Sequence, residues 1–339
     1  MQKLRAGVVT RVLAVAALTG LTLLGAVSVQ AQSQPQNAAQ NWPSKPVMLM
    51  VGSLAGSAPE VYARTVSEPL SRILGQPVLV EVRAGANGNV AAEFVASAPA
   101  DGYAIWIPAQ SQIEINPSAY DQLRWKPSDF TGVIKGGEAP LVLVVHPSVP
   151  ARNLAELVAW VKANPGKVSY ASFSPGTTSH FAGYQLNERY NLDMTHITFK
   201  GSAPQIQNLL GGHVPLGFSQ IQTGLPHIRD SKLMPIATTG ATRWRQLPEV
   251  PTLVELGLKD MVTTTWFGMM VRSATPPDIL AKIVSAAKRV HTDRNVKEKL
   301  EQAGFDVPAT ADAEFNEGIR NGLARWAKTV KATGFKAAN

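Results

Sequence analysis

Cysteine is missing from this chain of 339 residues. Disulfides, cysteine-based metal sites and a lipid anchor on an N-terminal cysteine are therefore excluded. The histidines show neither H-x-x-x-H nor H-E-x-x-H spacing, so we expect no zinc site; they are His146, His180, His196, His213, His227 and His291. The segment Gly85-Ala86-Asn87-Gly88-Asn89 also lacks the G-x-G-x-x-G order of a dinucleotide loop. We predict no bound metal and no cofactor.

A complete hydrolase signature is missing too. The nucleophile elbow of α/β-hydrolases reads G-x-S-x-G. The segment Ser172-Phe173-Ser174-Pro175-Gly176 has serine where the first glycine belongs. A proline directly after the nucleophile would also remove the backbone N–H that an oxyanion hole needs. We therefore predict no catalytic residues and expect that the protein is not an enzyme.

A long apolar run occurs once, at the N-terminus. Basic residues precede an almost wholly apolar stretch from Val12 to Val27, and Val29-Gln30-Ala31 resembles a signal-peptidase site. This run is shorter than the roughly 20 apolar residues that span a bilayer. Residues 1–31 are predicted to be a signal peptide cleaved after Ala31, and residues 32–41 a disordered leader. The mature protein would be periplasmic and not a lipoprotein.

Charge gives little indication of a macromolecular partner. The formal net charge is +8, to which Lys3, Arg5 and Arg11 of the predicted signal peptide contribute three. The remaining basic residues are scattered, with a mild concentration near the C-terminus. A nucleic-acid-binding protein would gather them on one face or one helix. No nucleic-acid partner is predicted.

The mature chain has roughly 300 residues, beyond the size at which a single core usually stops growing, so two lobes are expected. Short apolar runs alternate with longer helical patterns, which predicts an α/β fold with a largely parallel sheet and helices on both faces. The clearest predicted strands are Val47–Val51, Val78–Val82, Tyr103–Ile107 and Leu141–Val145. A helix is expected from Asn153, its N-cap, to Asn164, and the chain after Pro277 is expected to be almost purely helical.

Two glycine- and hydroxyl-rich loops carry the functional prediction. The first, Val51 to Glu60, follows an apolar run and opens a helical pattern. Free N–H groups at a helix start form an anion site when no bulky side chains are in the way. Ser57 and Glu60 also have the S-x-x-E spacing of a capping box. Glu60 therefore either caps its own helix or biases ligand selection at the rim of a site.

The second loop, Ser172 to Ser179, offers the hydroxyls of Ser174, Thr177, Thr178 and Ser179 just before a helix start. A carboxylate would gain about 1.5–3 kcal/mol from each charge-assisted hydrogen bond. A few such bonds reach the roughly −8 kcal/mol of micromolar affinity. The alternative is an ordinary capped turn. Two such loops predict two lobes that grip one carboxylate-bearing solute.

A third junction begins at Lys200. Ser202 lies three residues before Gln205, so structural capping is the favoured interpretation, with Gly201 and Ser202 as possible donors at the pocket floor. His180 lies one turn into the second predicted helix and could reach the pocket. Capping or core packing is the favoured role of this histidine.

These residues lead to a family resemblance. The chain resembles the Bug/TctC family, the solute-binding receptors of tripartite tricarboxylate transporters, over nearly the whole mature sequence. The matching segments are Trp42-Pro43-Ser44-Lys45-Pro46, Leu74-Gly75-Gln76-Pro77-Val78, Ala100-Asp101-Gly102-Tyr103, Ser169-Tyr170-Ala171-Ser172, Gly176-Thr177-Thr178-Ser179-His180, Lys200-Gly201-Ser202-Ala203-Pro204, Leu210-Gly211-Gly212, Leu247-Pro248-Glu249-Val250-Pro251-Thr252 and Trp266-Phe267-Gly268. Each segment alone is weak, but their combination in this order is specific.

The resemblance implies a type II periplasmic binding fold whose two lobes, each with a mostly parallel sheet flanked by helices, close on a carboxylated solute. Lobe 1 would comprise residues 42–143 and 264–339, and lobe 2 residues 144–263. The resemblance also implies delivery of a small organic acid, a di- or tricarboxylate or an aromatic carboxylate, to membrane permease subunits. A monomer is expected.

The departures from the family pattern fall in the expected pocket. Family members commonly show Pro-Gly-Gly-Ser-x-Asp in the first loop and an Asp-Asn pair where this chain has Ser219-Gln220. Phe173, Pro175 and Trp266 suggest a bulkier pocket for a less polar or aromatic acid. The residues predicted to bind the ligand are Leu54, Ala55, Gly56, Ser57, Glu60, Ser111, Phe173, Ser174, Pro175, Gly176, Thr177, Thr178, Gly201, Ser202, Ser219 and Gln220.

Three other functions remain open at this point. An exported hydrolase is disfavoured by the broken elbow. The effector domain of a transcription regulator can share the fold class, but the signal peptide and the lack of N-terminal DNA-binding helices count against it. A receptor repurposed for signalling to a membrane sensor is compatible with the sequence.

Overall fold

The computed structural model describes residues 41–337. The predicted signal peptide, and the leader up to Gln40, lie outside the described residues. From Pro43 onward the chain forms one compact unit. Within residues 41–337, every helix is too short or too polar to cross a bilayer.

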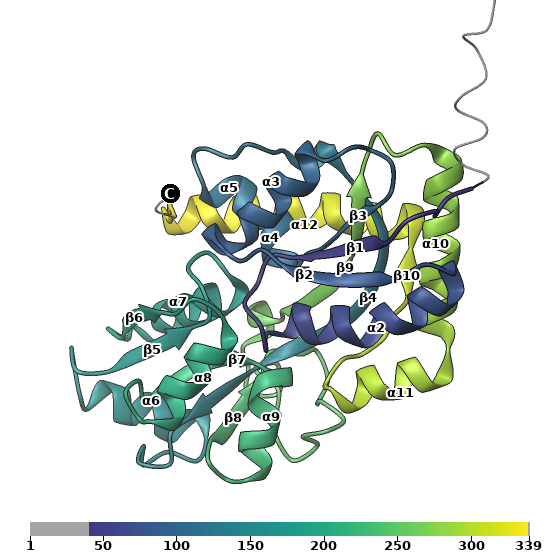
Figure 1. The fold of residues 1–339 in the computed structure, drawn as a ribbon. Helices are drawn as coiled ribbons and strands as arrows, with labels where there is room; N and C mark the ends of the chain where they lie inside the picture. Colours follow the sequence, from purple (N-terminus) through teal and green to yellow (C-terminus); the bar gives the residue numbers. More distant parts are fainter. Residues whose placement is uncertain (1–40, 338–339) are drawn as a thin grey trace, which may run out of the picture. The chain divides into compact units, whose positions relative to one another are not determined.

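A mixed sheet organises this unit (Figure 1), and its main strand order is β2-β1-β3-β9-β4-β7-β5-β6, with β8 and β10 also paired to β4. The strands are β1 Val47–Val51, β2 Val78–Val82, β3 Ala104–Ile107, β4 Phe130–Val145, β5 Ser169–Ser172, β6 Thr195–Thr198, β7 Leu216–Gln220, β8 Met234–Thr238, β9 Thr264–Arg272 and β10 Thr310–Ala311. The predicted parallel pairing is found at both ends of this order, where β1 pairs with β2 and β3, and β5 with β6 and β7. In the middle, β9 and β4 are antiparallel to their neighbours.

The central strand β4 belongs to two groups of strands. Its part from Phe130 to Pro140 pairs with β9, and its part from Leu141 to Val145 pairs with β7 and β8. We call β2, β1, β3, β9 and Phe130–Pro140 the first half of the sheet, and Leu141–Val145, β7, β5, β6 and β8 the second half. The predicted strand Leu141–Val145 is therefore only the end of a 16-residue strand. The lobe boundaries at 143/144 and 263/264 stay a prediction.

Helices join most strands. They are α2 Ala58–Leu74, α3 Asn89–Ser97, α4 Gln110–Glu114, α5 Asn116–Ala119, α6 Leu154–Lys162, α7 Thr178–Tyr190, α8 Ser202–Leu210, α9 Ile221–Arg229, α10 Pro277–Thr292, α11 Arg294–Gln302 and α12 Asp312–Thr333, with short 3-10 helices at Ala86–Gly88, Pro127–Asp129 and Lys259–Met261. The predicted N-cap is confirmed, because Asn153 Oδ1 accepts a hydrogen bond from the Glu156 amide at 2.9 Å. The predicted helical C-terminal region is confirmed as α10, α11 and α12.

Both faces of the second half are covered. Leu141, Leu143 and Val145 of β4 belong to one buried cluster, while Val142 and Val144 belong to another on the opposite face. This is the two-residue alternation of a strand. Burial of each such side chain contributes about 1.5–3 kcal/mol. The core thus lies on both sides of β4 and holds it in one register.

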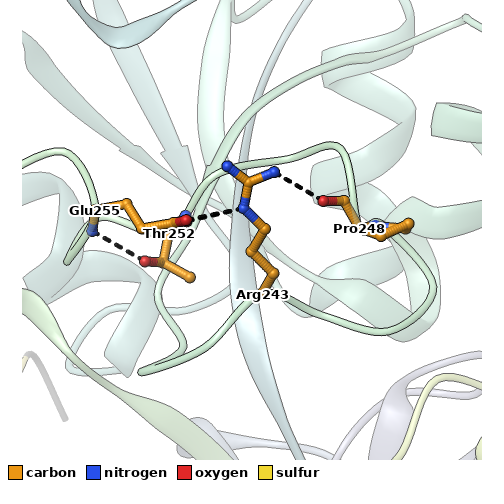
Figure 2. Close-up of polar contacts among 4 residues, drawn as sticks. All are labelled: Arg243, Pro248, Thr252 and Glu255. Carbon is orange, nitrogen blue, oxygen red and sulfur yellow. Dashed lines mark hydrogen bonds and ion pairs between the residues drawn. The ribbon is translucent and has the colours of Figure 1, made fainter.

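The loop after β8 is tied by polar contacts (Figure 2). Arg243 Nε donates to Glu255 at 2.9 Å, and its guanidinium also donates to the Pro248 carbonyl. The Glu255 amide donates to Thr252 Oγ1, and the Thr252 amide donates back to the Glu255 carboxylate at 2.7 Å. The hydrogen bond from the Thr252 backbone and then that from Arg243 lower the pKa of Glu255. These contacts fix the path by which the chain returns towards β9.

Candidate functional site

The predicted ligand residues follow the carboxyl ends of five strands. The loop after β1 opens α2, and those after β3, β5, β6 and β7 open α4, α7, α8 and α9. Ligands of open α/β sheets bind outside the carboxyl ends of the strands, at points where the topology changes. Here Gln220 of β7 pairs with Leu141, and Thr264 of β9 pairs with Pro140. The carboxyl end of β7 and the amino end of β9 therefore meet where β4 passes from the first half of the sheet to the second.

Several contacts bring these loops together. The Gly201 amide donates to the Phe173 carbonyl at 2.7 Å, which joins the third junction to the second loop. Thr178 Oγ1 lies 3.0 Å from Thr265 Oγ1, which joins the second loop to β9. Leu54 of the first loop reaches over Gly201, where an added Cβ would lie 3.8 Å from Leu54 Cδ1. Loops of both halves of the sheet thus form one cluster.

The capping box predicted at the first loop does not form. Ser57 is the N-cap of α2, but its side chain makes no capping hydrogen bond. Glu60 instead accepts from the Gly56 amide at 3.2 Å and pairs with Arg64 one turn later. The two amides that a capping box would use go to backbone carbonyls instead: the Ser57 amide donates to Leu54 and the Glu60 amide to Ser57.

Three of the four hydroxyls predicted as donors in the second loop are already used. Thr177 Oγ1 donates to the Ser174 carbonyl at 2.7 Å, and Ser179 Oγ donates to the Phe218 carbonyl at 2.5 Å. The Thr178 hydroxyl is engaged by Thr265, as described above. These side chains hold the loop against β7 and β9 rather than pointing freely at a ligand.

Backbone amides are the open donors of this loop. The first hydrogen bond that closes α7 runs from the Phe181 amide to the Thr177 carbonyl. The amides of Thr178, Ser179 and His180 precede it and find no acceptor within residues 41–337. Unpaired N–H groups at the positive end of a helix favour an anion. The geometry supports the predicted anion site, with amides in place of hydroxyls.

Three buried hydroxyls in this region have no partner. Ser57, Ser202 and Ser219 are 3%, 2% and 0% exposed, and their Oγ atoms find no hydrogen bond among the described residues. A buried polar group without a partner costs about 1–3 kcal/mol. All three are predicted ligand residues at the carboxyl ends of different strands. Unsatisfied hydroxyls at the ends of three different strands favour the binding of another molecule at this edge of the sheet.

The remaining predicted residues divide by exposure. Ser111, Gly176 and Gln220 are buried, Ser174 and Pro175 are partly buried, and Leu54, Ala55 and Gly56 are exposed. The described part of the chain contains cavities of about 370 Å³ at the outer end of the second half and about 490 Å³ beside α12, and neither is lined by a predicted ligand residue.

The two aromatic residues expected beside the ligand have protein partners. Phe173 packs in a core cluster of the second half. Trp266 donates from Nε1 to Glu114 Oε1 at 2.8 Å and packs edge-on against Phe315. Thr265, the preceding residue of β9, faces Thr178, so Trp266 lies on the opposite face of the strand. The packing of Trp266 contradicts the prediction of an aromatic wall at this position.

A histidine pair beneath the second loop was not predicted. The rings of His180 and His196 stack at 4.0 Å with an angle of 8°. His180 Nδ1 accepts from the Gly176 amide at 3.2 Å, and His196 Nε2 lies 2.6 Å from Ser172 Oγ. Burial, followed by the neighbouring His196, lowers the pKa of His180 to about 3, and burial lowers that of His196 to about 4. Of the two roles favoured for it, capping or core packing, His180 has core packing, within a pair that spacing alone could not indicate.

Glu114 forms a second buried polar group, on the other face of β9. Its carboxyl accepts from Trp266 and, at 2.9 Å, from Gln110 Nε2. Burial raises the pKa of Glu114 to about 7 despite these hydrogen bonds. Among residues 41–337 no group of three or more histidine or acidic side chains is arranged to hold a metal ion. Burial thus favours the neutral form of the Glu114 carboxyl and of the His180 and His196 rings.

Comparison with known proteins places this geometry in a family. Residues 62–335 match the family model described as "Tripartite tricarboxylate transporter family receptor". The chain is 34% identical over 295 residues to the UPF0065 protein in the gbd 5' region of Cupriavidus necator, covering 86% of each chain. It is 31% identical over 301 residues to Protein BugT of Bordetella pertussis, covering 88% of this chain and 92% of BugT.

Solved structures agree. The periplasmic binding protein BugD superposes with a TM-score of 0.82 at 28% identity, over 87% of this chain and 99% of BugD. Rpa4515 of R. palustris with adipate gives the same four values. MatC of Rhodopseudomonas palustris with bound malate gives a TM-score of 0.80 at 27% identity, over 85% and 100% of the two chains. The fold is that of periplasmic binding proteins, and the chain belongs to the Bug/TctC family of tripartite tricarboxylate transporter receptors.

Proposed function

We propose that this protein is a periplasmic receptor that binds one small organic carboxylate among the loops after β1, β5, β6 and β7 and delivers it to the permease of a tripartite transporter. The observation that carries the proposal is the set of unpartnered, buried hydroxyls of Ser57, Ser202 and Ser219. They lie at the ends of β1, β6 and β7, and the open amides lie at the start of α7, which follows β5. A carboxylate that accepts hydrogen bonds from such groups removes their desolvation cost and adds charge-assisted bonds.

An aliphatic dicarboxylate is the ligand class we favour. Two solved structures of the same fold, Rpa4515 and MatC, are described with adipate and with malate. The argument for an aromatic acid rested on Phe173 and Trp266, and the packing of both side chains weakens it. Neutral donors from both halves of the sheet suit a molecule with a carboxylate at each end.

A thermal-shift screen against di- and tricarboxylates, amino acids and benzoate-type acids tests this proposal. A ligand at a hundredfold over its dissociation constant stabilises the protein by about 2.7 kcal/mol. We expect stabilisation by one class of carboxylate, with adipate and malate among the first to test. The proposal is refuted if every acid leaves the melting temperature unchanged in protein refolded free of ligand.

Ser202→Ala and Ser219→Ala give a sharper test. Each removes a buried hydroxyl that has no partner, so the ligand-free variant should be as stable as the wild type or more stable. Each should nevertheless weaken binding about tenfold, because the ligand loses a donor. Ser179→Ala is the matched control, since its hydroxyl donates to Phe218 and its loss should reduce stability instead. Unchanged affinity in both test variants would exclude these hydroxyls from the site.

Closure of the two halves on the ligand should make the protein more compact. Small-angle scattering with and without saturating ligand measures this, and identical profiles would argue against closure.

Delivery to a permease is tested by uptake of the labelled acid in cells with and without the receptor. Mass spectrometry of the exported protein should find Gln32 at its N-terminus if Ala31 is the cleavage site, and light scattering should report a monomer.

A hydrolase remains the second candidate because of one contact. Ser172 Oγ lies 2.6 Å from His196 Nε2, a serine–histidine pair that the sequence did not predict. Ser172 is however fully buried, and no carboxylate among residues 41–337 contacts the His196 ring. A nucleophile must reach its substrate and its base needs an orienting partner. Hydrolysis of a chromogenic ester that is lost in Ser172→Ala would favour this candidate.

A further inference from the structure

The chain end after α12 returns to the ligand loops. Gly334 adopts the left-handed conformation, with a φ of 63°, and turns the chain at the end of the helix. Lys336 Nζ then pairs with Asp121 at 2.5 Å, and the Ala337 amide donates to the Ala119 carbonyl at 2.8 Å. These two contacts fasten the segment to α5 and the turn that follows it, where α12 ends beside α5 (Figure 1).

Phe335 lies between the turn at Gly334 and the two contacts of Lys336 and Ala337, and it points at the second loop. Its ring packs edge-on against His180 at 4.8 Å and against Phe181 at 5.8 Å, both residues of α7. Its Cε1 atom lies 3.0 Å from the position of a Cβ added to Gly176. Gly176 has a φ of 68°, so two independent constraints favour glycine there. Phe335 therefore covers both the loop and the first turn of α7.

His180 passes this contact on to the backbone of the loop. Its Nδ1 accepts from the Gly176 amide, which requires a neutral ring with the proton on Nε2. A face of the ring stacks on His196. The imidazole is thus held by two aromatic contacts, the stacked His196 ring and the T-shaped contact with Phe335. Its lone pair fixes the direction of the peptide that precedes the open amides of α7.

We propose that Phe335 and His180 are positioning residues for the ligand loop 173–178. Phe335 holds the His180 ring, and the ring holds the Gly176 amide, so that the following amides point together at one anion. We call the contacts of Phe335 with His180 and of His180 with the Gly176 amide the brace. Because the segment of Phe335 is fastened to α5 while His180 belongs to α7, the brace also links the chain end to the loop that would bind the ligand. The role in ligand binding rests on the proposed function; the role in ordering the loop does not.

Hydrogen exchange of a peptide covering residues 172–180 tests the ordering directly, without a ligand. Phe335→Ala and His180→Phe should speed exchange in this peptide by about tenfold, the factor that one lost hydrogen bond is worth. His180→Asn keeps an acceptor near Nδ1 and should stay closer to the wild type than His180→Phe. Val330→Ala, which thins the same buried cluster from within α12, is the control for general destabilisation. Wild-type exchange in Phe335→Ala, or an increase spread evenly over the molecule, would overturn the brace.

Calorimetric titration with adipate and with malate then tests the link to binding. Phe335→Ala and His180→Phe should raise the dissociation constant about tenfold, whereas Val330→Ala, which also destabilises the cluster, should leave it near the wild-type value. Phe335→Leu should restore part of the affinity because it refills the contact. Wild-type affinity in Phe335→Ala with a loosened loop would overturn the positioning role. If the wild type binds neither these acids nor any other carboxylate of the panel, the proposed function fails, and the exchange experiment still decides whether the brace exists.

Discussion

Replacing Glu114 by glutamine is expected to stabilise the protein at alkaline pH. Burial raises the pKa of this carboxyl from 4.5 to about 7. At low pH the carboxyl is protonated in both states and its burial adds no pH-dependent penalty. As the pH rises, the unfolded chain releases the proton first, so the folded state loses stability until the pH has passed about 7. Between pH 5 and pH 8 this loss amounts to about 2.5 kcal/mol.

Glutamine fits the same contacts without a charge. Its Oε1 can accept from Trp266 Nε1, and its amide can donate to Gln110 Oε1, a buried atom that has no partner among the described residues. Gln110 needs only to rotate its amide for this exchange. The variant therefore keeps two hydrogen bonds and removes the ionisation that burial opposes.

Urea unfolding of the wild type and of Glu114→Gln at pH 5 and pH 8 measures the effect. The stability difference between the two proteins should shift by about 2.5 kcal/mol in favour of the variant from the lower to the higher pH. Glu317→Gln replaces an exposed carboxylate of α12 and serves as the control, because Glu317 and Glu114 both line the cavity of about 490 Å³ beside α12. A difference that is the same at both pH values would refute the reasoning, as would a variant that is less stable at pH 8.

Three further predictions concern stability. Gly183→Ala should cost about 1–3 kcal/mol in urea unfolding, because a Cβ there would lie 2.1 Å from the Tyr170 ring; no loss would mean that the ring moves freely. Asn153→Ala removes the acceptor of the Glu156 amide and should cost about 1 kcal/mol in the same assay. His291 has its pKa lowered from 6.5 to about 4 by burial, so only the unfolded chain takes up its proton as the pH falls through this window. This uptake should lower the free energy of unfolding by about 1.4 kcal/mol for each unit by which the pH falls, and a urea midpoint that does not change with pH would contradict this.

The sequence predicts those elements whose signals are local. An apolar run such as Val47–Val51 and a cap such as Asn153 carry their own evidence, and the structure confirms both. The first part of β4 is different, because Gly132, Gly136 and Gly137 interrupt its pattern. A Cβ on Gly136 would lie 2.1 Å from the Tyr62 hydroxyl and 2.2 Å from His291 Nε2. That strand is set by tertiary packing that spacing cannot reveal.

The candidate site shows the same division. Helix starts rich in glycine and serine indicated which loops to examine, and three of their buried hydroxyls lack partners. The sequence could not tell which donors are free. It suggested the Thr177 and Ser179 hydroxyls, which the fold uses internally, and it paired Ser57 with Glu60, which Arg64 engages instead. Which of several neighbouring groups forms a hydrogen bond with a given donor or acceptor depends on the tertiary structure, which residue spacing does not give.

The central place of β9 in the strand order constrains how the chain folds during synthesis. β9 lies between β3 and β4, and it enters the sheet only after all strands of the second half have been made. The first half therefore lacks the strand between β3 and β4 until β9 has been made, whereas all strands of the second half precede β9 in the chain. Domains generally fold as units in the order in which they are made. Here the middle of the chain should become protected from exchange earlier than its beginning.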